Sequence, residues 1–228
     1  MTTNTAALIS RLHRSYPNGA PSDEQVRAQE VTYLPAQWAR RWPIGMDRPG
    51  IIDGPDPASV TRADLFGQAT TIASEADAVA AFVAICAWGT GTSAPSVSRC
   101  AKALADPKLG PKLLAARDLA VVDPLAAYMS MMQGGENKVA GLGPAFFTKW
   151  LHFSAFDRCE VHHRPLILDA LVAVTLGWHT TGWAGSTYAA YLDIAEQVRQ
   201  RWCPDQPSYT VEYGLFQLRA TERRRGWP

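Results

Sequence analysis

Two stretches with helix-forming patterns, joined by a glycine-containing turn, constrain the fold of this chain more than any other feature. Asp123 and Pro124 suit the N-cap and the first position of a helix that continues through Met132. The turn Gly141-Leu142-Gly143 precedes a proline that can open a second helix over 144–156. We therefore expect a helix, a tight turn and a second helix over about residues 124–156.

The rest of the chain also carries helical rather than strand patterns. Val79, Phe82 and Cys86 follow the spacing of one buried helix face, and we expect this helix, over 75–88, to end before Gly89. The first 70 residues are interrupted by prolines and glycines, which predicts short helices and loops. Alternating strand patterns are scarce, so we expect an all-α fold that forms one domain. Further helices are expected over residues 96–105, 111–120, 170–177, 186–202 and 211–218.

Composition excludes several classes of protein. Hydrophobic residues make up 47% and charged residues 19% of the chain, which is typical of a folded protein and not of a disordered one. The four cysteines lie far apart in the sequence, so we expect reduced thiols, no metal and no cofactor. No apolar run is long enough to span a bilayer and the N-terminus lacks a secretory signal, so we expect a cytoplasmic protein without a membrane partner.

The charge pattern is compatible with a nucleic-acid partner. A net charge of +1 neither requires nor excludes one, because a local patch can be basic while the whole chain is neutral. Between residues 99 and 149, seven Lys or Arg side chains stand against four Asp or Glu side chains. This segment, which contains the glycine turn, is therefore the expected phosphate-facing side.

The glycine turn suits the hairpin of a helix-hairpin-helix unit. Glycines let the chain turn while exposing backbone N–H groups, and the helix that follows points its positive end at the same anion. An ordinary turn between helices is the alternative for a glycine pair considered alone. We assign contacts with a DNA backbone to Lys138, Gly141, Leu142, Gly143 and, in a later loop, Arg164.

Lys149 and Asp169 are the candidate chemical groups. Lys149 stands in the second helix among Phe146, Phe147 and Trp150, where apolar surroundings favour the neutral, nucleophilic form of an amine. The alternative is a lysine that extends from the edge of a buried helix face into solvent. Asp169 suits the N-cap of the next helix, and it can also stabilise positive charge that builds on a sugar as a glycosidic bond breaks.

Together these motifs resemble the helix-hairpin-helix DNA glycosylase superfamily. The segments GLGPAFFTKWLHF and PLILDALVA are similar to bacterial proteins with an 8-oxoguanine glycosylase fold and to the archaeal 8-oxoguanine glycosylases. The specific match covers about residues 138–176. In commoner members the lysine stands two residues after the second hairpin glycine, where this chain has Ala145, and Lys149 lies one helical turn later on the same face. The iron–sulfur ligand set of some members is missing.

The resemblance implies a function as well as a fold. It implies two helical lobes with an active-site cleft between them, and a monomer that binds double-stranded DNA containing a modified base. Lys149 would attack C1′ of the deoxyribose, release the base and hold the sugar as a Schiff base, with Asp169 as its partner and AP-lyase activity as a second step. Trp88, expected in a glycine-rich loop, and Phe216 would line the pocket of the flipped-out base.

Two questions stay open at the level of sequence. The excised base could be an oxidised purine such as 8-oxoguanine, or a hypermodified base of phage DNA, which would give the protein a role in antiviral defence. A different class of function is a non-catalytic helix-hairpin-helix protein that binds DNA, in which Lys149 contacts a phosphate. A covalent adduct with DNA distinguishes the enzyme from the binding protein.

Overall fold

The protein is a helical assembly, described by a computed structural model for residues 3–43, 45–159 and 163–224. The all-α class is therefore confirmed. The helices are α1 (Thr5–Ser15), α2 (Asp23–Arg27), α3 (Pro35–Ala39), α4 (Arg62–Thr70), α5 (Glu75–Thr90), α6 (Ala94–Ala101), α7 (Leu109–Val122), α8 (Pro124–Met131), α9 (Pro144–Ala155), α10 (Ala170–Thr175), α11 (Gly185–Trp202) and α12 (Tyr209–Arg224), with 3-10 turns η1 (Gly50–Ile52), η2 (Lys102–Ala105) and η3 (Phe156–Arg158).

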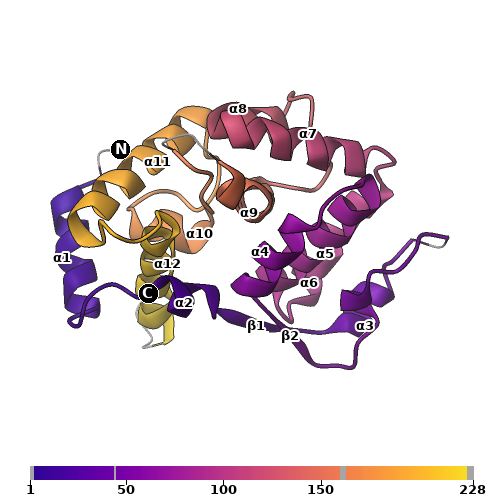
Figure 1. The fold of residues 1–228 in the computed structure, drawn as a ribbon, viewed down its shortest axis with the longest axis horizontal. Helices are drawn as coiled ribbons and strands as arrows, with labels where there is room; N and C mark the ends of the chain where they lie inside the picture. The colour runs from indigo at the N-terminus through magenta and orange to yellow at the C-terminus, as the bar shows by residue number, and fades with distance from the viewer. Residues whose placement is uncertain (1–2, 44, 160–162, 225–228) are drawn as a thin grey trace.

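Helix α9 lies near the centre of the molecule (Figure 1). It packs against α4, α5, α7 and α8. Helices α1, α10, α11 and α12 pack on one another at the left of Figure 1, and α8 joins them through α11. The segment before α10 therefore runs between the central helix and this group, which is where the two candidate chemical groups have to meet.

A small antiparallel sheet is the main element that sequence analysis did not predict. Strands β1 (Glu30–Tyr33) and β2 (Ala58–Thr61) pair with Glu30 opposite Thr61 and Tyr33 opposite Ala58. The amide of Arg62 continues this pairing by donating to the carbonyl of Gln29 at 3.1 Å. The sheet thus fixes the start of α4 beside the segment that precedes β1.

The helix ends follow the local capping chemistry of the sequence. The Asp123 side chain accepts a hydrogen bond from the amide of Ala126 at the start of α8, and Pro124 occupies the first helical position. Several expected boundaries differ from the structure; α12, for example, extends to Arg224 instead of ending near residue 218. One such difference moves a candidate site residue. Helix α5 continues through Gly89 to Thr90 and is capped by Gly91, which has a φ of 53°. Trp88 therefore lies in a helix and not in a glycine-rich loop.

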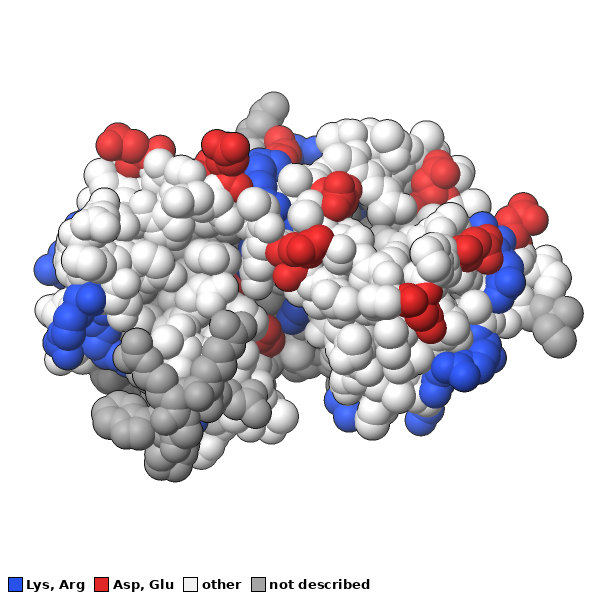
Figure 2. Space-filling view, turned by 90° about the horizontal axis from the view of Figure 1, so that it is seen from below, with Lys and Arg blue, Asp and Glu red and all other residues white. Residues whose placement is uncertain are grey.

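The surface carries both signs of charge. Figure 2 shows Lys and Arg mainly toward the two sides of the face that it draws, with Asp and Glu between them, and a hollow near the middle of that face. The four cysteines are buried free thiols. In the part of the chain that the structure describes, no helix has the length and apolar character that crossing a bilayer requires. The predicted cleft between two lobes stays a prediction.

Candidate active site

The structure brings Lys149 and Asp169 into direct contact. Lys149 Nζ lies 3.2 Å from Asp169 Oδ2, and it also donates to the carbonyl of Ala145 at 2.8 Å. The two side chains are mostly covered, with 7% and 16% of their surfaces exposed. A lysine that simply extends into solvent is therefore excluded. The contact with Ala145 shows the amine reaching back by one helical turn, as expected for positions on one helix face.

Asp169 has two roles, one for each carboxylate oxygen. Its Oδ1 accepts hydrogen bonds from the amides of Leu171 and Val172 at 3.0 and 3.2 Å, so Asp169 is the N-cap of α10 as predicted. The other oxygen, Oδ2, faces the amine of Lys149. Because capping fixes the carboxylate plane, the start of α10 orients the oxygen that contacts Lys149.

Gly89 is a site residue that sequence analysis missed. A Cβ at this position would lie 3.0 Å from Cδ and 3.3 Å from Cε of Lys149, and 3.4 Å from the ring of Phe146. The aliphatic part of Lys149 therefore lies directly against the backbone of α5, and the amine lies 5.8 Å from the centre of the Phe146 ring. A glycine inside an otherwise apolar helix was the available signal.

The predicted hairpin, Gly141-Leu142-Gly143, leads directly into α9. Gly141 has a φ of 78°, which favours glycine, and Gly143 is the N-cap of α9. Within the residues that the structure describes, the backbone amides of Gly141 and Gly143 donate to no acceptor. Leu142 is buried and anchors the turn, while Lys138 Nζ donates to the Leu142 carbonyl at 2.8 Å. In this structure the amine of Lys138 therefore binds the hairpin itself.

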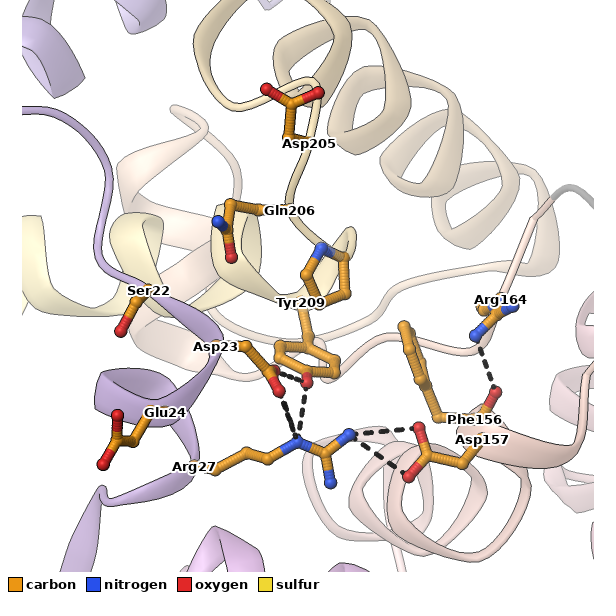
Figure 3. A pocket seen from close by; sticks show the side chains of 11 residues that line it. Ser22, Asp23, Glu24, Arg27, Phe156, Asp157, Arg164, Asp205, Gln206 and Tyr209 are labelled. Atoms are coloured by element: carbon orange, nitrogen blue, oxygen red, sulfur yellow. Dashed lines mark hydrogen bonds and ion pairs between the residues drawn. The ribbon is translucent and has the colours of Figure 1, made fainter.

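Arg164 lies in different surroundings from the hairpin. Arg164 donates to the carbonyl of Phe156 at 3.4 Å, and its guanidinium carbon lies over the Phe156 ring, 5.1 Å from the ring centre. Figure 3 shows it at the edge of a pocket of about 650 Å³, where Arg27 pairs with Asp23 and Asp157. Glu24 and Asp205 also line this pocket, and no hairpin residue does. The carboxylates around Arg164 make its predicted contact with phosphate less favourable.

Trp88 and Phe216, the predicted base-pocket residues, differ in exposure. Trp88 is buried in α5, donates to the carbonyl of Gln29 at 3.4 Å and packs its ring against Phe153. Phe216 is half-buried on α12. The guanidinium of Arg62 lies 5.0 Å from the centre of the Trp88 ring, so one face of this tryptophan is already covered.

A buried ion pair beside Trp88 is the second feature that sequence analysis missed. Arg62 and Glu212 are 0% and 1% exposed, and Arg62 Nη1 lies 2.8 Å from Glu212 Oε2. Arg62 Nε also donates to the side chain of Gln29 at 2.7 Å. Burial raises the pKa of Glu212, and Arg62 opposes that effect. The partners are 150 residues apart in sequence, so no local pattern indicated the pair.

Comparison with known proteins identifies a family for this chain. Residues 24–216 match the family described as "Putative 8-oxoguanine DNA glycosylase OGG-like protein". No curated protein and no solved structure matches the chain. The family match includes the hairpin, the lysine and the aspartate, and it covers most of the chain. This protein therefore belongs to the 8-oxoguanine DNA glycosylase OGG-like family, a family of DNA glycosylases.

Proposed function

We propose that this protein excises a modified base from double-stranded DNA by attack of Lys149 on the sugar, and that it then cleaves the strand as an AP lyase. The observation that supports this most directly is the 3.2 Å contact between Lys149 Nζ and Asp169 Oδ2 at a covered position. A lysine that only neutralised a phosphate would need an exposed amine and no carboxylate partner.

The contact suggests how each group takes part. Asp169 Oδ2 is close enough to accept a proton from the amine, which leaves a lone pair on Nζ. That lone pair forms a bond to C1′ while the bond from C1′ to the base breaks, and the departing base takes the bonding electrons and the proton that Asp169 holds. The Asp169 carboxylate, regenerated as this proton leaves, stabilises the positive charge that develops on the sugar and on the attached amine.

The lyase step follows from the same covalent intermediate. After the second amine proton leaves and the sugar ring opens, C1′ and Nζ form a Schiff base. Loss of a C2′ proton then breaks the bond between C3′ and its oxygen, and the phosphate leaves with the bonding electrons. Water finally hydrolyses the imine and regenerates Lys149. Throughout, the free amides of the hairpin are suited to bind a phosphate of the DNA backbone.

The base that we propose as substrate is an oxidised purine such as 8-oxoguanine, in keeping with the family. A hypermodified base of phage DNA is the other candidate that the same lysine chemistry accommodates. Base excision from an invading genome would then make the enzyme part of an antiviral defence. Assaying base release from duplexes that carry each of these bases distinguishes the two substrates.

Borohydride trapping tests the proposed chemistry. The wild-type protein should form a covalent adduct with a duplex carrying its substrate base, because borohydride reduces the Schiff base, and Lys149→Ala should form none. Arg14→Ala, which removes an exposed cation on α1 outside the segment 99–149, is the control and should behave as wild type. Asp169→Asn retains a good N-cap residue and should lower turnover by about 100-fold or more without weakening DNA binding.

Tight duplex binding without an adduct or base release on any tested base would instead support a non-catalytic DNA-binding protein. An active Lys149→Ala enzyme would contradict the assignment of the nucleophile. Full activity in Asp169→Asn would contradict the role of the carboxylate.

A further inference from the structure

The segment immediately before Asp169 is buried although it belongs to no helix or strand. Pro165, Leu166, Ile167 and Leu168 are all buried. Backbone amides and carbonyls in such a segment need hydrogen-bond partners, because leaving them unpaired away from water is costly. Regular secondary structure supplies none here, so side chains have to do so. We call residues 165–168 the strap.

Helix α11 holds the middle of the strap through two tyrosines. The hydroxyl of Tyr188 accepts from the amide of Leu166 at 3.1 Å and donates to the carbonyl of the same residue at 3.0 Å. The hydroxyl of Tyr191, one turn further along α11, donates to the carbonyl of Ile167 at 2.9 Å. Both tyrosines are fully buried, so these hydroxyls are shielded from water.

Helix α9 holds the two ends of the strap. His152 Nδ1 lies 2.9 Å from the carbonyl of Pro165, and the hydroxyl of Thr148 accepts from the amide of Leu168 at 3.1 Å. The Thr148 hydroxyl is itself fixed, because it donates to the carbonyl of Pro144 at 2.6 Å within α9. The strap is thereby tied to the helix that carries Lys149.

The contact of Thr148 with Leu168 lies next in sequence to the contact of Lys149 with Asp169. Thr148 precedes Lys149 and Leu168 precedes Asp169, so two hydrogen bonds of 3.1 and 3.2 Å join the same two segments at adjacent positions. Displacing Leu168 from α9 would move the backbone of Asp169 and increase its separation from the amine. A displacement of about 1 Å at a reacting group can cost about 100-fold in rate.

We propose that Thr148 and Tyr191 are positioning residues for the reaction, which act by fixing the strap and so the separation between Lys149 and Asp169. The inference rests on the function proposed above for that pair. A side chain should affect the reaction rate more when the strap residue that it holds lies closer in sequence to Asp169. Thr148, which holds Leu168, should therefore affect the rate most, Tyr191 at Ile167 less, and Tyr188 at Leu166 least.

The same contacts predict a different order for stability. Tyr191→Phe leaves the Ile167 carbonyl without its side-chain partner, whereas Tyr188→Phe leaves both backbone groups of Leu166 without one. Thr148→Val leaves the Leu168 amide without its partner; the Thr148 hydroxyl also lies 3.4 Å from the Leu168 carbonyl, but its single hydrogen is used in the shorter bond of 2.6 Å to Pro144. Tyr188→Phe should therefore lower the melting temperature most. If these side chains only stabilised the fold, Tyr188→Phe would also lose the most activity. If they position Asp169, Tyr188→Phe should lose the least activity.

Trapping on a pre-formed abasic duplex with cyanoborohydride is the suitable experiment. It measures attack of Lys149 on C1′ without depending on which base the enzyme removes. We expect Thr148→Val to slow trapping by about 10- to 100-fold, Tyr191→Phe by about 3- to 10-fold and Tyr188→Phe by less than about 3-fold. The DNA dissociation constant should stay within about 2-fold of wild type in all three. Thr148→Ser retains the hydroxyl and should restore the rate.

Each outcome of this experiment is informative. Rates that follow the order of melting temperatures, or a folded Thr148→Val protein within about 2-fold of the wild-type rate, would overturn the proposal. Slow trapping by Thr148→Ser would also count against it, since the hydroxyl would then not be the group that matters. A wild-type protein that gives no adduct with the abasic duplex would refute the proposed function itself, which is a distinct result.

Discussion

At the scale of single residues, the site depends on the missing side chain of Gly89 as well as on the amine of Lys149. Gly89 stands inside α5, where alanine would favour the helix by about 1 kcal/mol. Its missing side chain leaves the space that the Cδ and Cε atoms of Lys149 occupy. Local helix propensity and the requirements of the lysine are therefore opposed at this position.

Gly89→Ala separates these two effects. The new Cβ would lie 3.0 Å from Lys149 Cδ, and because that side chain is flexible we expect it to shift rather than the helix. The free energy of unfolding should stay the same or rise by up to about 1 kcal/mol, while trapping on an abasic duplex should slow by about 10-fold or more. Thermal unfolding and trapping rates measured on one preparation test this. A rate equal to that of wild type would show that the position of Lys149 does not depend on Gly89.

At the scale of elements, the sequence predicted what local chemistry decides. Asp123 with Pro124 correctly indicated the start of α8, and Asp169 the start of α10. The strands β1 and β2 were not predicted, because they pair across 24 intervening residues and neither shows clear alternation of buried and exposed positions. A capping residue acts on its own helix, whereas a strand needs a partner that the local pattern does not reveal.

The residues of the candidate site likewise fall into those that a local motif reveals and those that only packing reveals. Lys149 and Asp169 were found because each lies in a recognisable motif, and the structure places them in contact. Gly89 and the pair of Arg62 with Glu212 were missed, since their importance arises from packing between segments that are distant in sequence. Their roles follow only from the arrangement of the helices.

The hairpin between α8 and α9 can be tested as an element by Gly143→Ala. Gly143 has a φ of −99° and a Cβ there would meet nothing within 4 Å, so the fold should lose less than about 1 kcal/mol. The added methyl group would stand in the path of a phosphate approaching the free amides, and we expect DNA affinity to fall by about 10-fold. Titration at one fixed salt concentration measures this. Gly67→Ala, where a Cβ also meets nothing, is the control; an equal loss in both variants would argue against a phosphate at the hairpin.

At the scale of the whole molecule, packing brings charged and titratable groups into an apolar interior. Arg62 on α4 and Glu212 on α12 are 150 residues apart in sequence and meet in the core. His152, on α9, is buried against the aromatic rings of Phe66 and Phe156. Burial lowers the pKa of His152 to about 3, and the nearby Arg62 adds to the effect. Because a carbonyl oxygen can only accept, the neutral ring carries its hydrogen on Nδ1, which lies 2.9 Å from the carbonyl of Pro165.

This depressed pKa makes folding sensitive to acid. His152 titrates near its ordinary value of 6.5 when unfolded and near 3 when folded. The unfolded chain therefore binds the proton first, and stability present above about pH 6.5 is lost as the pH falls toward 3. Each pH unit below 6.5 costs about 1.4 kcal/mol, so moving from about pH 7 to about pH 5 should lower the free energy of unfolding by about 2 kcal/mol.

Urea unfolding of wild type and His152→Gln at both pH values isolates this contribution. The glutamine amide can still donate to the Pro165 carbonyl but does not titrate, so the variant should lose about 2 kcal/mol less than wild type on acidification. Glu212, whose pKa is raised by burial, changes stability in the opposite direction with pH. Because it is present in both proteins, its contribution cancels when their two losses are subtracted. Equal losses in wild type and variant would mean that His152 already takes up its proton in the folded protein, and the strap would then be held by a charged ring.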